Sequence, residues 1–219
     1  TTNEPNQGGT ADDAADTQGD MTVDFGLVPN MSIGSTVFFD MNNDGTQNLG
    51  NPQETGIAGV SVQLLADLNG DGSIQTSEVV ATDITDALGN YYFGNLIPGQ
   101  YQVLIPTTPS SAPLSSTANN PDNQVDGDDN GSQLAGLGTP VLSPVVTLAA
   151  GTEPTEAGTY PGNTQDDGAL TETNGDMTID FGFVPALSIG STVFYDADND
   201  GQQDADNPLE YGIAGVTVN

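Results

Sequence analysis

One twelve-residue segment, from Asp67 to Glu78, has the residue types and spacing of a calcium-binding loop. Side-chain oxygens recur at its first, third and fifth positions, and a glutamate at the twelfth can bind an ion through both carboxylate oxygens. The glycine at the sixth position permits a sharp turn, and the seventh residue can add its backbone carbonyl. The expected ligands are Asp67, Asn69, Asp71, Ser73 and Glu78.

A second segment begins with the same pattern at Asp40 but has Asn51, and not an acid, at its twelfth position. We expect Glu54 to close this loop. The arrangement recurs in a later copy, which favours a ligand role, although duplication of a repeat could also preserve it. The expected ligands are Asp40, Asn42, Asp44, Thr46 and Glu54 in the first copy, and Asp196, Asp198, Asp200 and Glu210 in the second.

A third acidic cluster, in residues 120–130, concentrates four carboxylates but follows no fixed template. Its expected ligands are Asp122, Asp126 and Asp128. Because Asp, Asn and Gly are ordinary turn formers, the alternative is a set of solvated turns without an ion. That alternative carries most weight for this cluster and least for the Asp67 loop.

The charge balance makes a bound cation the first hypothesis. The 219 residues include no Lys, Arg, His or Cys but 31 Asp and Glu, which gives a formal charge of −31. Such self-repulsion destabilises a compact state unless cations enter the fold, and it repels nucleic acid and anionic membranes. Zinc lacks its His and Cys ligands here, and numerous oxygen donors on flexible loops favour Ca²⁺ over Mg²⁺.

Neither catalysis nor membrane insertion is expected. An enzyme would have to work with carboxylates and hydroxyls alone, and a two-carboxylate glycosidase is the conceivable case. The chain supplies no histidine base and no cationic side chain to stabilise an oxyanion. It also contains no run of about 18 apolar residues, so we expect no membrane span.

The elements that must position these loops repeat along the chain. At an offset of 156 residues, 30 of the 45 positions in 19–63 are identical to those in 175–219. A period of this size is a whole domain rather than a solenoid turn. We therefore expect the end of one repeat in 1–29, a complete repeat in 30–185 and the beginning of another in 186–219.

Within the repeat, short segments alternate apolar with polar residues and are rich in Val, Ile, Thr and Tyr. About seven such segments, without helical periodicity, predict an all-β fold: a Greek-key sandwich of immunoglobulin-like or transthyretin-like type. The Asp67 loop should join two strands. The connection from about Thr107 to Pro140 is unusually long, and its acidic cluster suggests that an ion pins it.

Consecutive repeats should be held in a nearly fixed relation. The junction from FGFVP to ALSIG is short and contains Pro185, whereas Gly/Ser linkers behave as flexible coils. This predicts a stalk or filament whose partners are neighbouring repeats. Two alternatives stay open: a module that binds a host or matrix protein or a glycan, and assembly of identical chains into a homopolymeric fibre.

Three stretches carry a family resemblance: IGSTVFFDMNNDGTQNLGNPQETGIAGVSVQLL, TDITDALGNYYFGNLIPGQYQVLIP and DMTIDFGFVP. Together they resemble the B repeats of serine-aspartate repeat surface proteins, which are related to the collagen-adhesin B-type domains of bacterial adhesins. The resemblance implies an extracellular β-sandwich that binds several calcium ions and acts as a rigid spacer at a cell surface. Many relatives carry a Lys-to-Asn isopeptide bond, which a chain without Lys cannot form.

Overall fold

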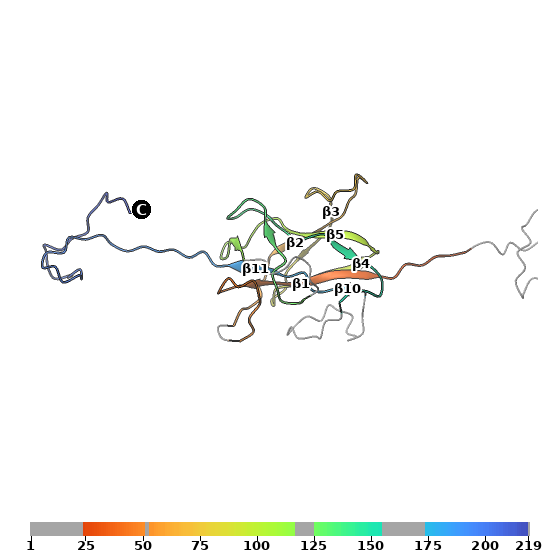
Figure 1. Cartoon of the computed structure of the whole chain (residues 1–219), viewed down its shortest axis with the longest axis horizontal. Coiled ribbons are helices and arrows are strands. Elements are labelled where there is room, and N and C mark those ends of the chain that lie inside the picture. Colours follow the sequence, from red (N-terminus) through yellow and green to blue (C-terminus); the bar gives the residue numbers. More distant parts are fainter. Residues whose placement is uncertain (1–23, 51–52, 117–124, 155–173, 219) are drawn as a thin grey trace, which may run out of the picture. The chain divides into compact units, whose positions relative to one another are not determined.

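A computed structural model describes residues 24–50, 53–116, 125–154 and 174–218. The chain divides into two units, Thr1–Pro185 and Ala186–Asn219, and all named strands lie in the first (Figure 1). The strands are β1 (Met31–Phe39), β2 (Ser61–Leu65), β3 (Val79–Ile84), β4 (Asn90–Leu96), β5 (Gly99–Ile105), β6 (Leu114–Ser115), β7 (Ser132–Gln133), β8 (Val141–Leu142), β9 (Val146–Leu148), β10 (Gly175–Asp176) and β11 (Phe181–Val184). In the described part of the chain no helix is present, and hence none that could cross a membrane.

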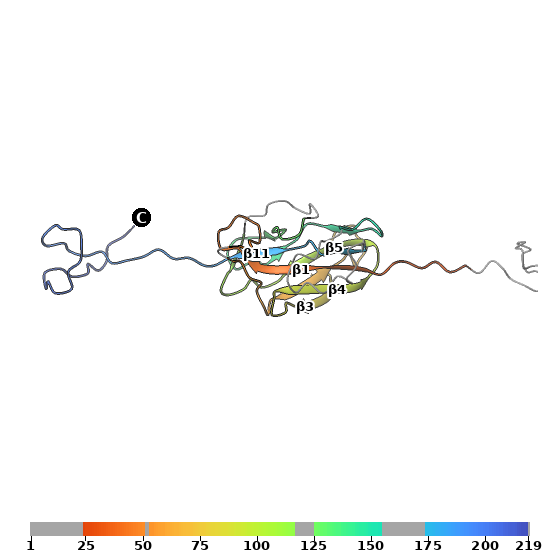
Figure 2. The same cartoon turned by 90° about the horizontal axis from the view of Figure 1, so that it is seen from below.

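The first sheet is organised around β1. The strand order is β10-β1-β11-β6, and β4 pairs with β1 as well. The first half of β1 runs parallel to β10, with Ser32 opposite Gly175, and its second half runs parallel to β11, with Val37 opposite Phe181. Figure 2 shows β1 extending along the unit beside β4 and β11. Strands from the two ends of the repeat therefore close this sheet.

The second sheet has the order β3-β2-β5-β8-β7, and β9 also pairs with β5. The chain changes sheets between β1 and β2, between β3 and β4, on either side of both β5 and β6, and between β9 and β10. The predicted all-β sandwich is confirmed. Each of the seven segments expected to be extended contains a strand, and the long connection adds the short strands β6 and β7.

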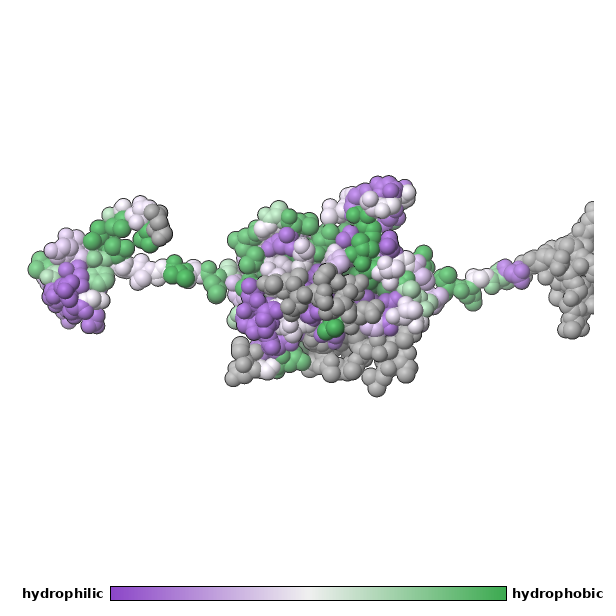
Figure 3. Space-filling model, in the orientation of Figure 1, coloured by the Kyte–Doolittle hydropathy of each residue, from purple (hydrophilic) through white to green (hydrophobic). Residues whose placement is uncertain are grey.

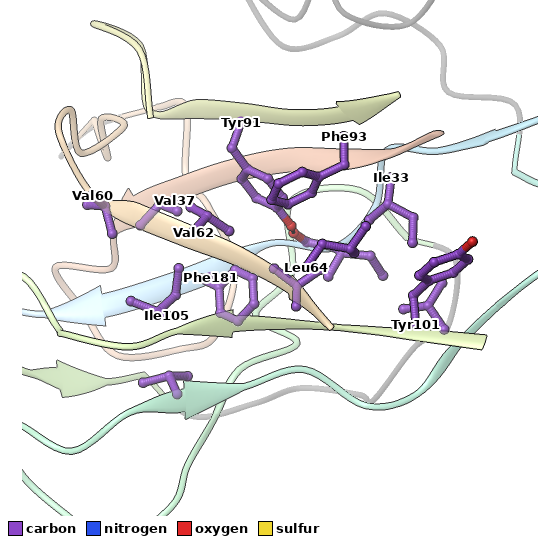
Figure 4. Close-up of a cluster of buried hydrophobic side chains, with 14 of the residues drawn as sticks. Ile33, Val37, Val60, Val62, Leu64, Tyr91, Phe93, Tyr101, Ile105 and Phe181 are labelled. Atoms are coloured by element: carbon purple, nitrogen blue, oxygen red, sulfur yellow. Dashed lines mark hydrogen bonds between the residues drawn. The ribbon is translucent and has the colours of Figure 1, made fainter. Parts of the chain in front are cut away.

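The core fills the space between the two sheets. Figure 4 shows Ile33, Leu64, Tyr91 and Phe181 pointing toward one another from β1, β2, β4 and β11. All four are almost completely buried. The rings of Tyr91 and Phe181 have centroids 6.3 Å apart in a tilted arrangement that aromatic pairs favour. This packing fixes the strand ends from which the acidic loops leave.

The second unit contains an acidic loop, and none of its described apolar side chains is buried. Its backbone forms an isolated bridge between Phe194 and Gly212, and the rings of Tyr195 and Tyr211 stack with centroids 6.0 Å apart. Ile189 is fully exposed, whereas Ile33, its counterpart 156 residues earlier, is fully buried. The loop geometry is therefore set by local residues.

Candidate metal centres

The loop between β2 and β3 curls around the side chains of its first and fifth residues. Asp67 accepts hydrogen bonds from the Gly70 amide at 2.7 Å through Oδ1 and from the Gly72 amide at 2.8 Å through Oδ2. The Asp71 carboxylate accepts the Ser73 amide at 2.9 Å. Gly72 has φ +85°, which favours glycine. Figure 3 shows this loop as a hydrophilic projection from the unit.

Glu78 closes the same loop from its far end. Its Oε1 accepts the amides of Leu68 and Asn69, each at 3.1 Å, and its Oε2 accepts the amide of Gln75 at 2.8 Å. The side chain is 6% exposed. The carboxylate is therefore turned toward the loop and not toward solvent, as the twelfth position of the template requires.

The loop after β1 has the same arrangement. Asp40 is fully buried, and its Oδ2 accepts the Gly45 amide at 2.8 Å. Glu54 is 1% exposed; its Oε1 accepts the Met41 amide and its Oε2 the Asn48 amide, both at 2.7 Å. The structure thus closes this loop with the Glu54 carboxylate, as expected.

The third and fifth positions are held alike in both loops. The side-chain oxygen of Asn42 accepts the Asp44 amide at 3.1 Å, and Asp44 accepts the Thr46 amide at 3.0 Å. In the other loop Asn69 accepts the Asp71 amide at 2.8 Å. Oxygen atoms from alternate residues therefore line one side of each turn, as a single ion would require.

The copy in the second unit repeats this geometry. Asp196 Oδ2 accepts the Gly201 amide at 2.9 Å. Glu210 accepts the Ala197 amide at 3.4 Å through Oε1 and the Asp204 amide at 2.7 Å through Oε2. Three loops with different sequences therefore share one bonding scheme.

Within the described part of the chain, carboxylate oxygens gather in groups of three in this second-unit loop. One oxygen each from Asp196, Asp198 and Glu210 lie within 4.8 Å of one another, and so do oxygens of Asp198, Asp200 and Asp204. Two ligands of one Ca²⁺ can lie up to about 5 Å apart, so either group fits a shared ion. Asp198 is exposed, but partial desolvation and the adjacent Asp200 carboxylate raise its pKa.

Carboxamide side chains change the electrostatics of the other two loops. Partial desolvation of the exposed Asp44 carboxylate would raise its pKa, but hydrogen bonds from Asn42 and Asn48 outweigh this effect and the pKa is lowered. The Gln75 side chain, followed by a backbone amide, lowers the pKa of Asp71. Side chains and amides of the same loops therefore already donate hydrogen bonds to these two carboxylates.

The third predicted cluster lies partly outside the described residues, which do not include Asp122. The described segment 125–131 is hydrogen-bonded to the Asp40 loop. The Gln47 amide donates to the Gly127 carbonyl at 2.7 Å, and the Asp129 amide donates to the Gly45 carbonyl at 2.8 Å. Asp126 is half-buried and Asp128 is 5% exposed. These bonds hold the long connection between β5 and β8 against the Asp40 loop.

Among the described residues, four buried carboxylates lie outside the expected set: Asp129, Glu153, Asp176 and Asp180. Asp180, just before β11, accepts Ser35 Oγ at 2.6 Å and the Thr36 amide at 3.0 Å through Oδ1, and the Gly127 amide at 2.7 Å through Oδ2. Burial, and to a lesser extent Asp128, raise its pKa. Asp24 stands at the position equivalent to Asp180 in the other copy of the repeat, so a comparison of the two copies could have pointed to this aspartate.

Asp129 is another of these buried carboxylates. Its Oδ1 accepts the amides of Gly131 and Gly182 at 2.9 and 3.0 Å, and its Oδ2 accepts Ser116 Oγ at 3.0 Å. Burial raises the pKa of Asp129 to about 7. Because the sequence has no cationic side chain, any compensating positive charge for these buried acids must come from solution.

A two-sheet sandwich that carries acidic loops between its strands, and whose sequence recurs at the length of a domain, defines a repeat module. The model of the SdrD B-like domain matches residues 31–153, and the chain belongs to that family. The match begins at β1 and ends after β9, before the β10 and β11 strands that pair with β1.

Curated relatives align with most of this chain. The serine-aspartate repeat-containing protein I of Staphylococcus saprophyticus is 34% identical over 197 residues, which is 87% of this chain and 8% of that protein. Protein E of Staphylococcus aureus (strain USA300) is 30% identical over 91% of this chain and 13% of its own length. Colossin-A of Dictyostelium discoideum is 30% identical over 90% of this chain and 1% of its length. The chain thus spans a small part of each relative.

Proposed function

We propose that this chain is a calcium-stabilised structural repeat of an extracellular surface protein. The observation that carries the proposal is the bonding scheme shared by the Asp40, Asp67 and Asp196 loops, in a sequence with 31 acidic and no basic side chains. Bound Ca²⁺ supplies positive charge where oxygen donors converge. The module acts mechanically and catalyses no reaction.

The size of the expected stabilisation is substantial. At a free calcium concentration ten times the dissociation constant, each site adds about 1.4 kcal/mol to the free energy of unfolding. Two or three sites then add about 3–4 kcal/mol, against a typical total of about 5–15 kcal/mol. Extracellular calcium modules have dissociation constants of about 0.1–1 mM, which supports a location in calcium-rich medium.

Exposure of repeat-equivalent residues supports a tandem array. Phe25 is 87% exposed, although Phe181, its counterpart 156 residues later, is completely buried in the core. A large apolar side chain in a strand-like segment favours burial. We therefore assign residues 24–28 to the closing strand of a preceding repeat. Neighbouring repeats, joined by short Pro-containing junctions, then form a stalk or filament.

Thermal unfolding of the whole chain tests the proposal. We expect millimolar Ca²⁺ to raise the melting temperature by several degrees, EDTA to reverse the increase, and Mg²⁺ at the same concentration to reproduce little of it. Magnesium serves as the control for general screening of charge. Equal melting temperatures in Ca²⁺ and in EDTA would reject calcium stabilisation.

A further inference from the structure

One buried acceptor in the first unit has no hydrogen-bond donor. Gln47 is 9% exposed, and within the described part of the chain its Oε1 is the only buried side-chain oxygen or nitrogen without a partner. Its Nε2 donates to the Glu54 carbonyl at 3.4 Å, and the reversed carboxamide would place two oxygens together there. A buried acceptor without a donor is unfavourable, so a ligand that supplies the missing N–H is favoured.

Gln47 forms part of the wall of a pocket of about 250 Å³ between the Asp40 loop and the turn before β4. The other wall residues that matter here are Thr36, Glu54 and Asn90, which are buried, and Leu49 and Leu88, which are about half exposed. Pockets for drug-sized ligands are larger, roughly 300–1,000 Å³. The volume therefore suits a single long side chain.

Both walls of the pocket are held by the sandwich. Val37 in β1 bonds to each of them: its amide donates to the Gly89 carbonyl at 2.9 Å, and its carbonyl accepts the Ile57 amide at 2.7 Å. The walls meet where Gly56 approaches the Leu88 carbonyl so closely that no Cβ would fit. The pocket is therefore formed before any ligand binds, as binding pockets usually are.

The charge around the pocket favours a cation. One wall carries the Glu54 carboxylate. In the other, Oδ1 of Asp86 accepts the amides of Leu88 and Asn90 at 2.8 and 2.9 Å. The sequence has no Lys, Arg or His to neutralise these carboxylates. A cleft lined by one sign of charge attracts ions of the opposite sign.

The donors and the apolar wall favour a lysine side chain among organic cations. Its aliphatic stem can pack on Leu49 and Leu88 while its ammonium donates to Gln47 Oε1. A second acceptor is Thr36 Oγ1, whose own hydrogen is donated to a neighbouring carboxamide at 3.1 Å. The planar fork of arginine suits an open carboxylate, but Glu54 is 1% exposed and bonded to backbone amides.

We propose that this pocket binds a lysine side chain of a partner protein. No part of this sequence, and no second copy of it, can supply a lysine. Because Oε1 of Gln47 is shielded from solvent, the carboxamide turns toward the pocket as the ammonium enters. Neither Gln47 nor Leu88 is an expected calcium ligand, so the site needs no bound ion and goes beyond the proposed function.

The two residues that supply acceptors recur in the next copy of the sequence. Thr36 and Gln47 correspond to Thr192 and Gln203 at the offset of 156. A single lysine binds weakly, but repeats that each present such a pocket would bind a lysine-rich surface with avidity. A structural repeat would thereby also adhere to a basic protein.

NMR titration of the full chain with blocked pentapeptides tests the proposal. One peptide has a lysine between alanines, and the other has norleucine, which keeps the stem but lacks the ammonium. About 0.15 M NaCl screens exposed charges, and the titration is run in Ca²⁺ and again in EDTA. We expect the lysine peptide to shift the Gln47 side-chain amide and the Leu88 methyl signals saturably. The norleucine peptide should bind about tenfold more weakly or not at all.

Variants assign the binding to the pocket. Gln47→Leu removes the acceptor and should raise the dissociation constant of the lysine peptide about tenfold. Gln203→Leu, at the exposed counterpart, is the matched control and should leave it unchanged. Leu88→Ser keeps the acceptor but removes the apolar contact, and it should raise the constant about threefold.

The possible results separate this inference from calcium stabilisation. Equal dissociation constants for the parent and Gln47→Leu, or shifts that spread over all acidic loops without saturation, would overturn the lysine site. If Gln47→Leu does not fold, the norleucine peptide and Leu88→Ser decide: equal binding in both comparisons overturns the site, and weaker binding supports it. Saturable binding in EDTA, together with melting that does not respond to Ca²⁺, would support the site while rejecting the proposed function.

Discussion

The backbone amide of Asn48 donates a 2.7 Å hydrogen bond to Oε2 of Glu54. The equivalent bonds join Gln75 to Glu78 at 2.8 Å and Asp204 to Glu210 at 2.7 Å. The donor is always the ninth residue from the first aspartate, although the glutamate is twelfth in one loop and fifteenth in the other two. Three extra residues therefore lengthen the path to the glutamate without moving its carboxylate out of the loop.

Replacement of this glutamate should affect the protein both with and without calcium. Glu78→Ala removes an acceptor for three amides, together with the expected bidentate ligand of the proposed ion. We expect the free energy of unfolding in EDTA to fall by about 2 kcal/mol, because hydrogen bonds to a charged group are lost. In Ca²⁺ the loss should be larger, since one ion is also released. Urea unfolding in EDTA and in Ca²⁺ measures the two losses of unfolding free energy.

Asp71→Asn is the matched control in the same loop. Asp71 is exposed, and an asparagine at this position keeps the oxygen that accepts the Ser73 amide. Its effect in EDTA should stay within about 0.5 kcal/mol, while calcium affinity falls. If both variants lose stability equally in EDTA, the proposed inward role of Glu78 is wrong.

A close backbone approach beside the Asp40 loop gives a prediction independent of calcium. A Cβ added to Gly56 would lie 1.6 Å from the Leu88 carbonyl oxygen, which cannot move without disturbing the turn before β4. Gly56→Ala should therefore destabilise the first unit by more than about 3 kcal/mol or prevent its folding. Circular dichroism and thermal melting of the variant measure this loss.

The repeat supplies the control for that substitution. Gly212 is the counterpart of Gly56, but the nearest atom to a Cβ added there is Thr192 Cγ2, at an ordinary contact distance of 3.5 Å. Gly212→Ala should leave the melting temperature of this chain unchanged. A comparable loss from both substitutions would show that the tight approach to Leu88 is not the cause.

The strands could be predicted because their signal is local. Alternation of apolar and polar residues in SVQLL and QYQVLI specifies β2 and β5, and it also places Val62, Leu64 and Val103 in the core. The parallel pairing of β1 with β10 and β11 has no such signal. It joins residues more than 140 positions apart, as in the register of Val37 with Phe181.

The same distinction applies to the acidic sites. The positions within each loop could be predicted because their donors lie within about fifteen residues, so spacing describes geometry. Asp180 was missed because its environment is assembled from distant segments. It accepts bonds from Ser35, 145 residues away, and from Gly127, 53 residues away. The ligand roles of all these residues stay predictions.

Asp180→Asn should release the long connection from the sandwich. Oδ1 and Oδ2 of Asp180 each accept a backbone amide, from Thr36 and Gly127 respectively. An asparagine can accept only one of them, and its NH₂ group then faces an N–H donor. We expect a loss of about 1–3 kcal/mol and faster amide hydrogen exchange at Gly127. Unchanged exchange there would contradict this role.

Without calcium, stability should fall as the pH rises from about 4 to about 7. Burial raises the pKa of Asp129 from 3.8 to about 7, so in this interval the folded state holds a proton that the unfolded state has released. Stability is therefore greatest at the acidic end and is lost as the folded carboxyl ionises. Urea midpoints in EDTA at pH 5 and pH 8 should show this difference for the parent chain.

Asp129→Asn should flatten that pH dependence while preserving the local bonds. Oδ1 of an asparagine can accept both the Gly131 and the Gly182 amides, and its NH₂ can donate to Ser116 Oγ, which now accepts. The variant should match the parent near pH 4, exceed it by about 1–2 kcal/mol at pH 5, and exceed it by a few kcal/mol at pH 8 in EDTA. Other carboxylates still repel one another at high pH. The difference in unfolding free energy between the two chains, rather than the pH dependence of either chain alone, therefore isolates the contribution of Asp129. If the two chains lose stability in parallel as the pH rises, the buried Asp129 carboxyl is not the group that titrates.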